Sequence, residues 1–185
     1  MASTISAGTT SGTAIAISGD TSGNLAFQTQ AGANTITVPN ATGTVMVSGN
    51  MPAFSAYPST GQSYSQSTWT KVTLGTEAFD TNNNFASSTF TPTVAGYYQI
   101  NATANPQGTA MSQGGVSIYK NGSAYQYLSI LSATISGSTY TTSSVIYMNG
   151  STDYVEMYVF SNGTSPSIGS AQANVQFNGV LVRAA

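Results

Sequence analysis

Five carboxylates are the only acidic side chains in this sequence, and two pairs of them are close enough along the chain to suggest acid–base catalysis. Glu77 and Asp80 are three residues apart, as are Asp153 and Glu156. Positions three apart on a strand point to opposite faces, so neither pair forms a local catalytic dyad. Glycosidase activity would need an acidic pair assembled across the fold. We expect Asp153 to mark the start of a strand and Glu156 to occupy an exposed strand position.

The segment that begins at Asp80, Asp-Thr-Asn-Asn-Asn-Phe, resembles the start of a calcium-binding loop. Such a loop needs glycine at its sixth position and glutamate at its twelfth, where this chain has Phe85 and Thr91. Runs of asparagine are also common in ordinary turns. We therefore favour a polar loop, with a calcium ion near Asp80 as the alternative.

The remaining groups needed for catalysis or for binding polyanions are scarce. Histidine and cysteine are absent, so the serine-rich stretches have no partner to activate a nucleophile, and zinc sites lose their usual ligands. The three cations are too few to neutralise a track of phosphates or to bind an anionic membrane surface. The sequence predicts a protein that is not an enzyme, uses no cofactor, and binds neither nucleic acid nor membrane.

The rest of the composition predicts a folded chain with two regions. Hydrophobic residues make up 40% of the chain and charged residues only 4%, far below the roughly 25% of an ordinary soluble domain. Residues 1–50 contain no tyrosine or tryptophan, whereas aromatic residues are frequent from Met51 onward. We place the domain boundary between residues 50 and 51.

Residues 1–50 contain four short segments in which apolar residues alternate with polar ones, separated by turn sequences. Each segment offers too few side chains for a core of its own, so we expect its apolar stripe to attach the chain to a neighbouring protein. The alternative is a flexible linker rich in glycine, serine and threonine. The predicted attachment residues are Ile15, Ile17, Leu25, Phe27, Ile36, Val38, Val45 and Val47.

Residues 51–185 have the strand and turn spacing of an all-β sandwich, without helical periodicity. The Asn121-Gly122 pair between two apolar stretches predicts a two-residue hairpin turn. Alternation predicts that Tyr98 and Ile100 face the core, with Tyr97 and Gln99 on the other side. Strands are expected at residues 97–102, 116–119, 125–131, 140–148, 154–160 and 173–182.

The strand at 154–160 is unusual because neither of its faces is strongly charged. Alternation puts Val155, Met157 and Val159 on one face and Tyr154, Tyr158 and Phe160 on the other. The aromatic face could be solvated, since tyrosine fits a pleated surface. We favour an interface of a homotrimer, in which tyrosine supplies contact area and one hydroxyl, and we predict Tyr154, Tyr158 and Phe160 as interface residues.

Several motifs of the second region occur in the order found in one known family. They lie at residues 52–56, Phe85, 89–92, 95–100, 120–122, 153–155 and 177–181. In this order they resemble the globular head of complement-type and tumour-necrosis-factor-like proteins. The resemblance covers residues 51–185 and implies a trimeric jelly-roll β-sandwich. The chain departs from the family at Ile100, where phenylalanine is preferred, and in lacking the family's charged ligand-binding surfaces.

Residues 1–50 resemble a different class of protein. The segments at residues 22–29, 34–39 and 42–45 are similar to the β-repeats of low charge in bacteriophage fibres. Together the two resemblances imply a virion protein, made in the host cytoplasm because no signal peptide is seen. We favour a capsid decoration (cement) protein bound to the major capsid protein or another virion protein. The alternatives are a tail fibre or spike tip that binds a host-surface glycan or protein, and a non-viral adhesin.

Overall fold

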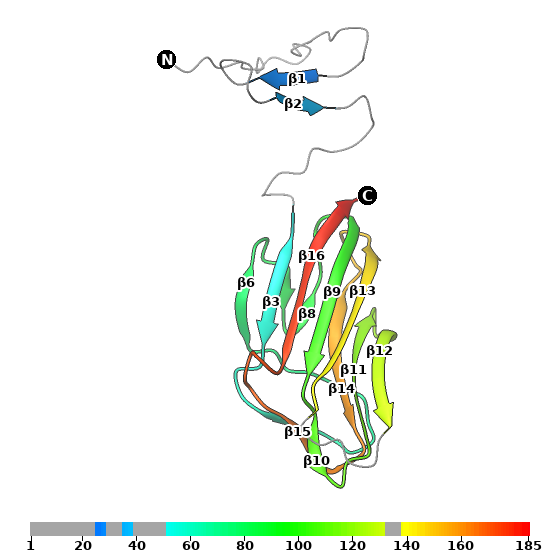
Figure 1. Cartoon of the computed structure of the whole chain (residues 1–185). Coiled ribbons are helices and arrows are strands. Elements are labelled where there is room, and N and C mark those ends of the chain that lie inside the picture. The colour runs from blue at the N-terminus through cyan, green and yellow to red at the C-terminus, as the bar shows by residue number, and fades with distance from the viewer. Residues whose placement is uncertain (1–24, 29–34, 39–50, 132–137) are drawn as a thin grey trace. The chain divides into compact units, whose positions relative to one another are not determined.

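The computed structural model describes residues 25–28, 35–38, 51–131 and 138–185 (Figure 1). All regular elements in this part of the chain are strands, which confirms the predicted all-β class. The described residues include no helix long and apolar enough to span a membrane. Contacts divide the chain into two compact units, residues 1–44 and 45–185. The boundary between residues 50 and 51 stays a prediction, because residues 39–50 lie outside the described part.

The described strands of the first unit form one antiparallel pair. Strand β1 (Leu25–Gln28) pairs with β2 (Thr35–Val38), so that Leu25 is opposite Val38 and Phe27 is opposite Ile36. Four of the predicted attachment residues therefore lie on paired strands. The other four, Ile15, Ile17, Val45 and Val47, lie outside the described residues.

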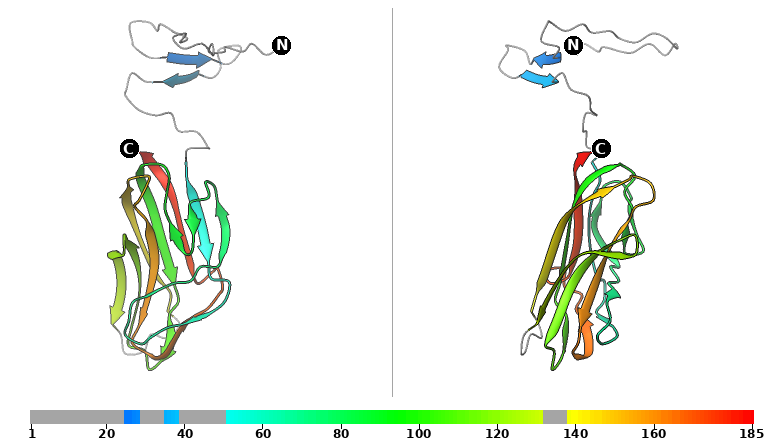
Figure 2. Two further views of the ribbon diagram at one scale, coloured as in Figure 1. Left: turned by 180° about the vertical axis from the view of Figure 1, so that it is seen from behind. Right: turned by 90° about the vertical axis from the view of Figure 1, so that its right-hand side faces the viewer.

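The second unit is a sandwich whose layers are visible edge-on in the right-hand view of Figure 2. Its first layer is a five-stranded antiparallel sheet with β13 and β6 at its two edges. In spatial order its strands are β13 (Tyr140–Met148), β9 (Gly96–Ala104), β16 (Gln176–Ala184), β3 (Ala53–Tyr57) and β6 (Thr76–Asp80). The predicted strand at 140–148 is confirmed to the residue, whereas the last strand begins at Gln176 instead of residue 173.

The second layer is a six-stranded sheet built around β14, with short strands along one side of it. Its strands are β12 (Ser123–Leu131), β11 (Gln113–Lys120), β14 (Val155–Ser161), β8 (Thr89–Phe90), β7 (Phe85–Ala86) and β5 (Thr70–Lys71), the last paired with β14. A small third sheet contains β10 (Gln107–Thr109), β15 (Thr164–Ile168) and β4 (Gln62–Ser63).

The core lies between the two large sheets and is rich in aromatic rings. Phe54 of β3 stacks on Phe90 of β8, with 4.2 Å between the ring centroids, and meets Phe85 and Phe177 at 5.2 and 5.1 Å. Such pairs stabilise a core beyond the area that they bury. The rings therefore join strands of both layers.

Two local predictions are confirmed by the structure. Tyr98 and Ile100 are fully buried, while Tyr97 is exposed and Gln99 is partly exposed, as alternation along a half-buried strand requires. The hairpin turn between β11 and β12 has positive φ at Asn121 (51°) and Gly122 (78°), the conformation of a tight two-residue hairpin.

The prediction that Glu156 is exposed is wrong. Glu156 is only 9% exposed, and its Oε1 atom accepts hydrogen bonds from Lys71 Nζ at 2.6 Å and Thr89 Oγ1 at 3.1 Å. Lys71 belongs to β5 and Thr89 to β8, two short strands that pair with β14. These strands cover the carboxylate. They also supply the hydrogen-bond partners that offset the free-energy cost of burying its charge.

Asp153 lies in the turn before β14, as the sequence predicted for a strand start. Its carboxylate accepts hydrogen bonds from Asn121 Nδ2 at 2.8 Å, Lys120 Nζ at 2.9 Å and the Asn149 backbone N–H at 3.1 Å. These donors, with Asn121 first, hold the pKa of Asp153 below its ordinary value. The carboxylate thus ties the 121–122 turn to the turn that follows β13.

Acidification is expected to remove this contribution to stability. Because the pKa of Asp153 is lower in the folded than in the unfolded chain, the contribution is complete above the unfolded value of about 3.9 and is lost as the pH falls below it. Asp153→Asn should therefore lower the melting temperature near neutral pH, and the difference from the wild type should shrink on acidification. A difference that stays constant across this range would contradict the assigned role.

Candidate functional site: the outer face of the five-stranded sheet

The residues predicted for the trimer interface lie at β14, in the six-stranded sheet. Tyr158 and Phe160 lie opposite the buried Val159 face, as alternation predicted, and Tyr154 immediately precedes the strand. Within the chain, Tyr158 stacks on Tyr119 at 3.7 Å and Phe160 packs against Trp69 at 5.3 Å. Part of these side chains is thus already covered, and their role as an interface stays a prediction.

A larger exposed apolar surface lies on the five-stranded sheet. Among the residues whose side chains are described, eight large apolar side chains are exposed, and only Met51 and Tyr125 lie outside this sheet. The other six come from β6, β9, β13 and β16: Phe79, Tyr97, Val145, Tyr147, Val180 and Val182. Clustered exposed apolar groups indicate a binding surface, whereas scattered ones do not. We call this surface the outer face of the five-stranded sheet.

The strand register shows how these side chains are arranged on the outer face. One row across the sheet is Val145, Gln99, Val180 and Ala53, in strands β13, β9, β16 and β3. The next row is Ser143, Asn101, Asn178, Ser55 and Phe79. Neither row contains a charged residue, so this part of the face is apolar or neutral and polar.

At one end of the outer face the third row contains two tyrosines. Tyr147 is opposite Tyr97, whose other neighbour in the register is Arg183. The two rings pack at 5.5 Å with an angle of 59°, and each side chain remains 44% exposed. Lys120 Nζ lies 6.0 Å from the centre of the Tyr147 ring, and its charge is balanced by Asp153 at 2.9 Å. This tyrosine pair therefore exposes part of two packed rings on the outer face.

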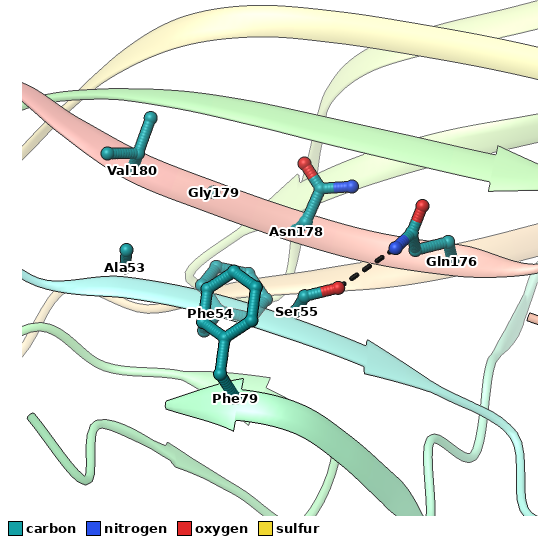
Figure 3. Close-up of a pocket in the computed structure, with 8 residues that line it drawn as sticks. All are labelled: Ala53, Phe54, Ser55, Phe79, Gln176, Asn178, Gly179 and Val180. Carbon is teal, nitrogen blue, oxygen red and sulfur yellow. Dashed lines mark hydrogen bonds between the residues drawn. The ribbon is translucent and has the colours of Figure 1, made fainter. Parts of the chain in front are cut away.

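At the opposite edge of the same face lies a hollow of about 420 Å³ (Figure 3). Phe79, Val180 and Ala53 supply its apolar walls. Ser55, Gln176 and Asn178 supply hydroxyl and amide groups, and no residue that lines the hollow is charged. Gly179 also belongs to it, but a Cβ there would lie 2.5 Å from Ile100 Cδ1, on the core side of the sheet.

Hydrogen bonds donated by side-chain amides hold the polar groups of the hollow in place. Gln176 Nε2 donates to Ser55 Oγ at 2.9 Å, and Asn101 Nδ2 donates to Asn178 Oδ1 at 2.9 Å. Gln99 Nε2 in turn donates to Asn101 Oδ1 at 3.2 Å. Neutral amides fixed in this way can recognise a hydroxyl or another amide without a cost for desolvating ions.

The structure shows how the loop that begins at Asp80 is held together. Asp80 closes its own loop, where its carboxylate accepts hydrogen bonds from the backbone N–H groups of Phe85 at 2.7 Å and Asn82 at 3.3 Å. Across the residues described here, no three acidic side chains gather where they could hold an ion. This geometry is that of the polar loop favoured from the sequence.

The sequence reasoning missed the outer face as a site. The outward orientation of Tyr97 and Gln99 was predicted, and the same alternation continued along residues 140–148 would have placed Val145 and Tyr147 outward. The hollow had no comparable signal, because β3, β6 and β16 come from residues 53–80 and 176–184 and meet only in the folded sheet.

The chain matches no family model and no curated protein by sequence. Its structure is similar to the globular domain of the zebrafish complement 1qA protein, with a TM-score of 0.53, 18% identity, and 72% of this chain and 99% of that chain covered. It is also similar to the Eiger TNF of S. frugiperda, with a TM-score of 0.55, 6% identity, and coverages of 73% and 93%.

A third similar structure is the vertex protein P5 of PRD1, with a TM-score of 0.52, 14% identity, and 73% of this chain and 98% of that chain covered. At these identities the similarity establishes the fold alone. The chain folds as a jelly roll of the type found in complement heads and tumour necrosis factors.

Proposed function

We propose that this chain is a structural protein that self-associates into a trimer through the outer face of the five-stranded sheet. The observation that supports this proposal is the concentration on that face of six of the eight large apolar side chains that are exposed among the described residues. A stable monomer rarely leaves such a surface in water. Burying a face whose central rows are neutral removes apolar area at little cost in ion desolvation.

A trimer agrees with the resemblance to complement heads and tumour necrosis factors. In a closed ring each copy uses the same surfaces, and no unpaired interaction surface remains exposed to solvent. The aromatic side chains at β14, Tyr154, Tyr158 and Phe160, are the second candidate for this interface. The two surfaces belong to different sheets, so single substitutions can separate them.

For the trimer we propose a role in a virion, as a capsid decoration protein that stabilises the phage head. The similarity to a vertex protein of PRD1 supports a particle location, and the low charge suits a permanent structural role. A tail fibre that binds a host-surface receptor is the second candidate, favoured by the fibre-like segments in residues 1–50. Quantitative mass spectrometry of purified particles distinguishes them: hundreds of copies per particle support decoration, whereas a few dozen chains or fewer support a fibre.

We further propose that residues 1–50 attach the chain to the particle while residues 51–185 self-associate, which gives a separate prediction. Deleting residues 1–50 should leave a folded, self-associating jelly roll that no longer joins the particle, because edge strands and their apolar side chains supply the docking contacts. Phe27→Ser in the full chain should weaken attachment without changing the melting temperature of the jelly roll. Full occupancy of particles by the truncated protein, measured by quantitative binding, would show that attachment occurs through the jelly roll.

A further inference from the structure

Two features of the outer face have complementary chemistry. The tyrosine pair, Tyr97 and Tyr147, lies exposed at the β13 side of the sheet, and the hollow beside Phe79 lies near the β6 edge. A tyrosine needs apolar surface for its ring and one polar partner for its hydroxyl. The hollow offers both, with Phe79, Ala53 and Val180 next to three neutral polar side chains.

We propose that the tyrosine pair of one copy occupies the hollow of the next copy, a contact that rests on the self-association proposed above. Each site is then incomplete without its neighbour, which supplies the rings that fill it. The ring of Tyr147 or Tyr97 packs on Phe79 and Val180, and the phenol hydroxyl hydrogen-bonds to the amides of Gln176 or Asn178.

Three observations favour a second copy of the chain as the occupant. The volume of about 420 Å³ exceeds that of a single methyl or water site and suits aromatic side chains. The lining carries no charge, so it offers no counter-ion for a phosphate, a carboxylate or an ammonium group. The tyrosines are 44% exposed but pack against each other, and this packing reduces the conformational entropy that they lose when they dock.

The placement of the two features allows a cyclic contact between copies. The tyrosine pair and the hollow are different patches of the same face, so in a ring each copy uses one patch on each neighbour. Such a heterologous contact generates a ring when its rotation closes, and three copies complete the proposed trimer. A two-fold dimer could use the same two patches in reciprocal contact, and covalent trimers distinguish the ring from such a dimer.

Cross-linking between introduced cysteines tests this arrangement, because the natural chain contains none. Val145→Cys lies on β13 beside the tyrosine pair, and Ala78→Cys lies on β6 next to Phe79. Val145 belongs to the outer face, but neither substitution removes a tyrosine of the pair or a residue that lines the hollow. Within one chain the two strands are four strand spacings apart, about 19 Å. A bis-maleimide shorter than that separation can therefore join the two cysteines only between chains.

The full-length double variant Val145→Cys/Ala78→Cys should give covalent dimers and trimers on a denaturing gel, whereas each single variant should remain a single chain. Cross-linking of the Val145→Cys variant alone would show that β13 of one copy faces β13 of the next, and would overturn the proposal. Absence of cross-links in a double variant that still sediments as a trimer would also overturn it, while leaving self-association intact. A double variant and a wild type that are both monomeric would instead overturn the proposed function itself.

Discussion

Replacing Ile100 with alanine should lower the free energy of unfolding by about 2–5 kcal/mol, the range measured for deleting buried aliphatic groups. Ile100 is fully buried at the centre of β9, and its Cδ1 atom packs directly over the backbone of Gly179 on β16. With strands on both sides of β9, the space left behind cannot be filled by a small movement. Urea or thermal denaturation of the full chain measures this loss.

Gln99→Ala is the matched control for this substitution. Gln99 is the adjacent residue on the same strand, but its side chain lies on the outer face, where it makes one hydrogen bond to Asn101. Its removal should change the free energy of unfolding by less than about 0.5 kcal/mol, as is usual at partly exposed positions. Equal losses for the two variants would show that the register of β9 is wrong.

Val180→Asp should dissociate the trimer without unfolding the chain. Val180 is exposed on β16, where a carboxylate is well solvated in the monomer. In the trimer the same carboxylate would be buried against the neutral lining of the hollow, at a cost of roughly 3 kcal/mol per interface, or about a hundredfold in the dissociation constant. Sedimentation equilibrium and the melting temperature together separate dissociation from unfolding.

The control for Val180→Asp introduces the same charge on the other large sheet. Tyr125 on β12 is comparably exposed, at 49% against 42% for Val180, and Tyr125→Asp should leave the trimer intact. Tyr158→Asp examines the second candidate interface at β14 in the same experiment. If Tyr158→Asp dissociates the trimer while the Val180→Asp trimer stays intact, the interface lies on the six-stranded sheet.

Much of the jelly roll could be predicted because the residue pattern that identifies a long strand or a tight turn lies within that strand or turn. Alternating burial along β9 and from Met157 onward along β14 follows from the side-chain period of a strand, and the Asn121-Gly122 turn follows from the backbone conformation that glycine permits. The resemblance to complement heads could be recognised in the sequence for the same reason, since each of its motifs lies within one strand or one turn.

The features that could not be predicted depend on contacts between distant segments. Strands β5 and β8 are two residues long and too short for a periodic signal, yet they cover Glu156 and provide Lys71 and Thr89 as its partners. The hollow likewise needs β3, β6 and β16 side by side. An aromatic-rich strand such as β14 therefore suggested an interface, while the larger apolar face became visible only in the folded sheet.

Sedimentation velocity of the unmodified full-length chain tests self-association most directly. At micromolar concentration and physiological salt we expect a single species with three times the 18.9 kDa mass of the chain. Its sedimentation coefficient should change little with added salt, because the central rows of the outer face hold no charged groups for ions to screen. A single species of 18.9 kDa under the same conditions would contradict the account.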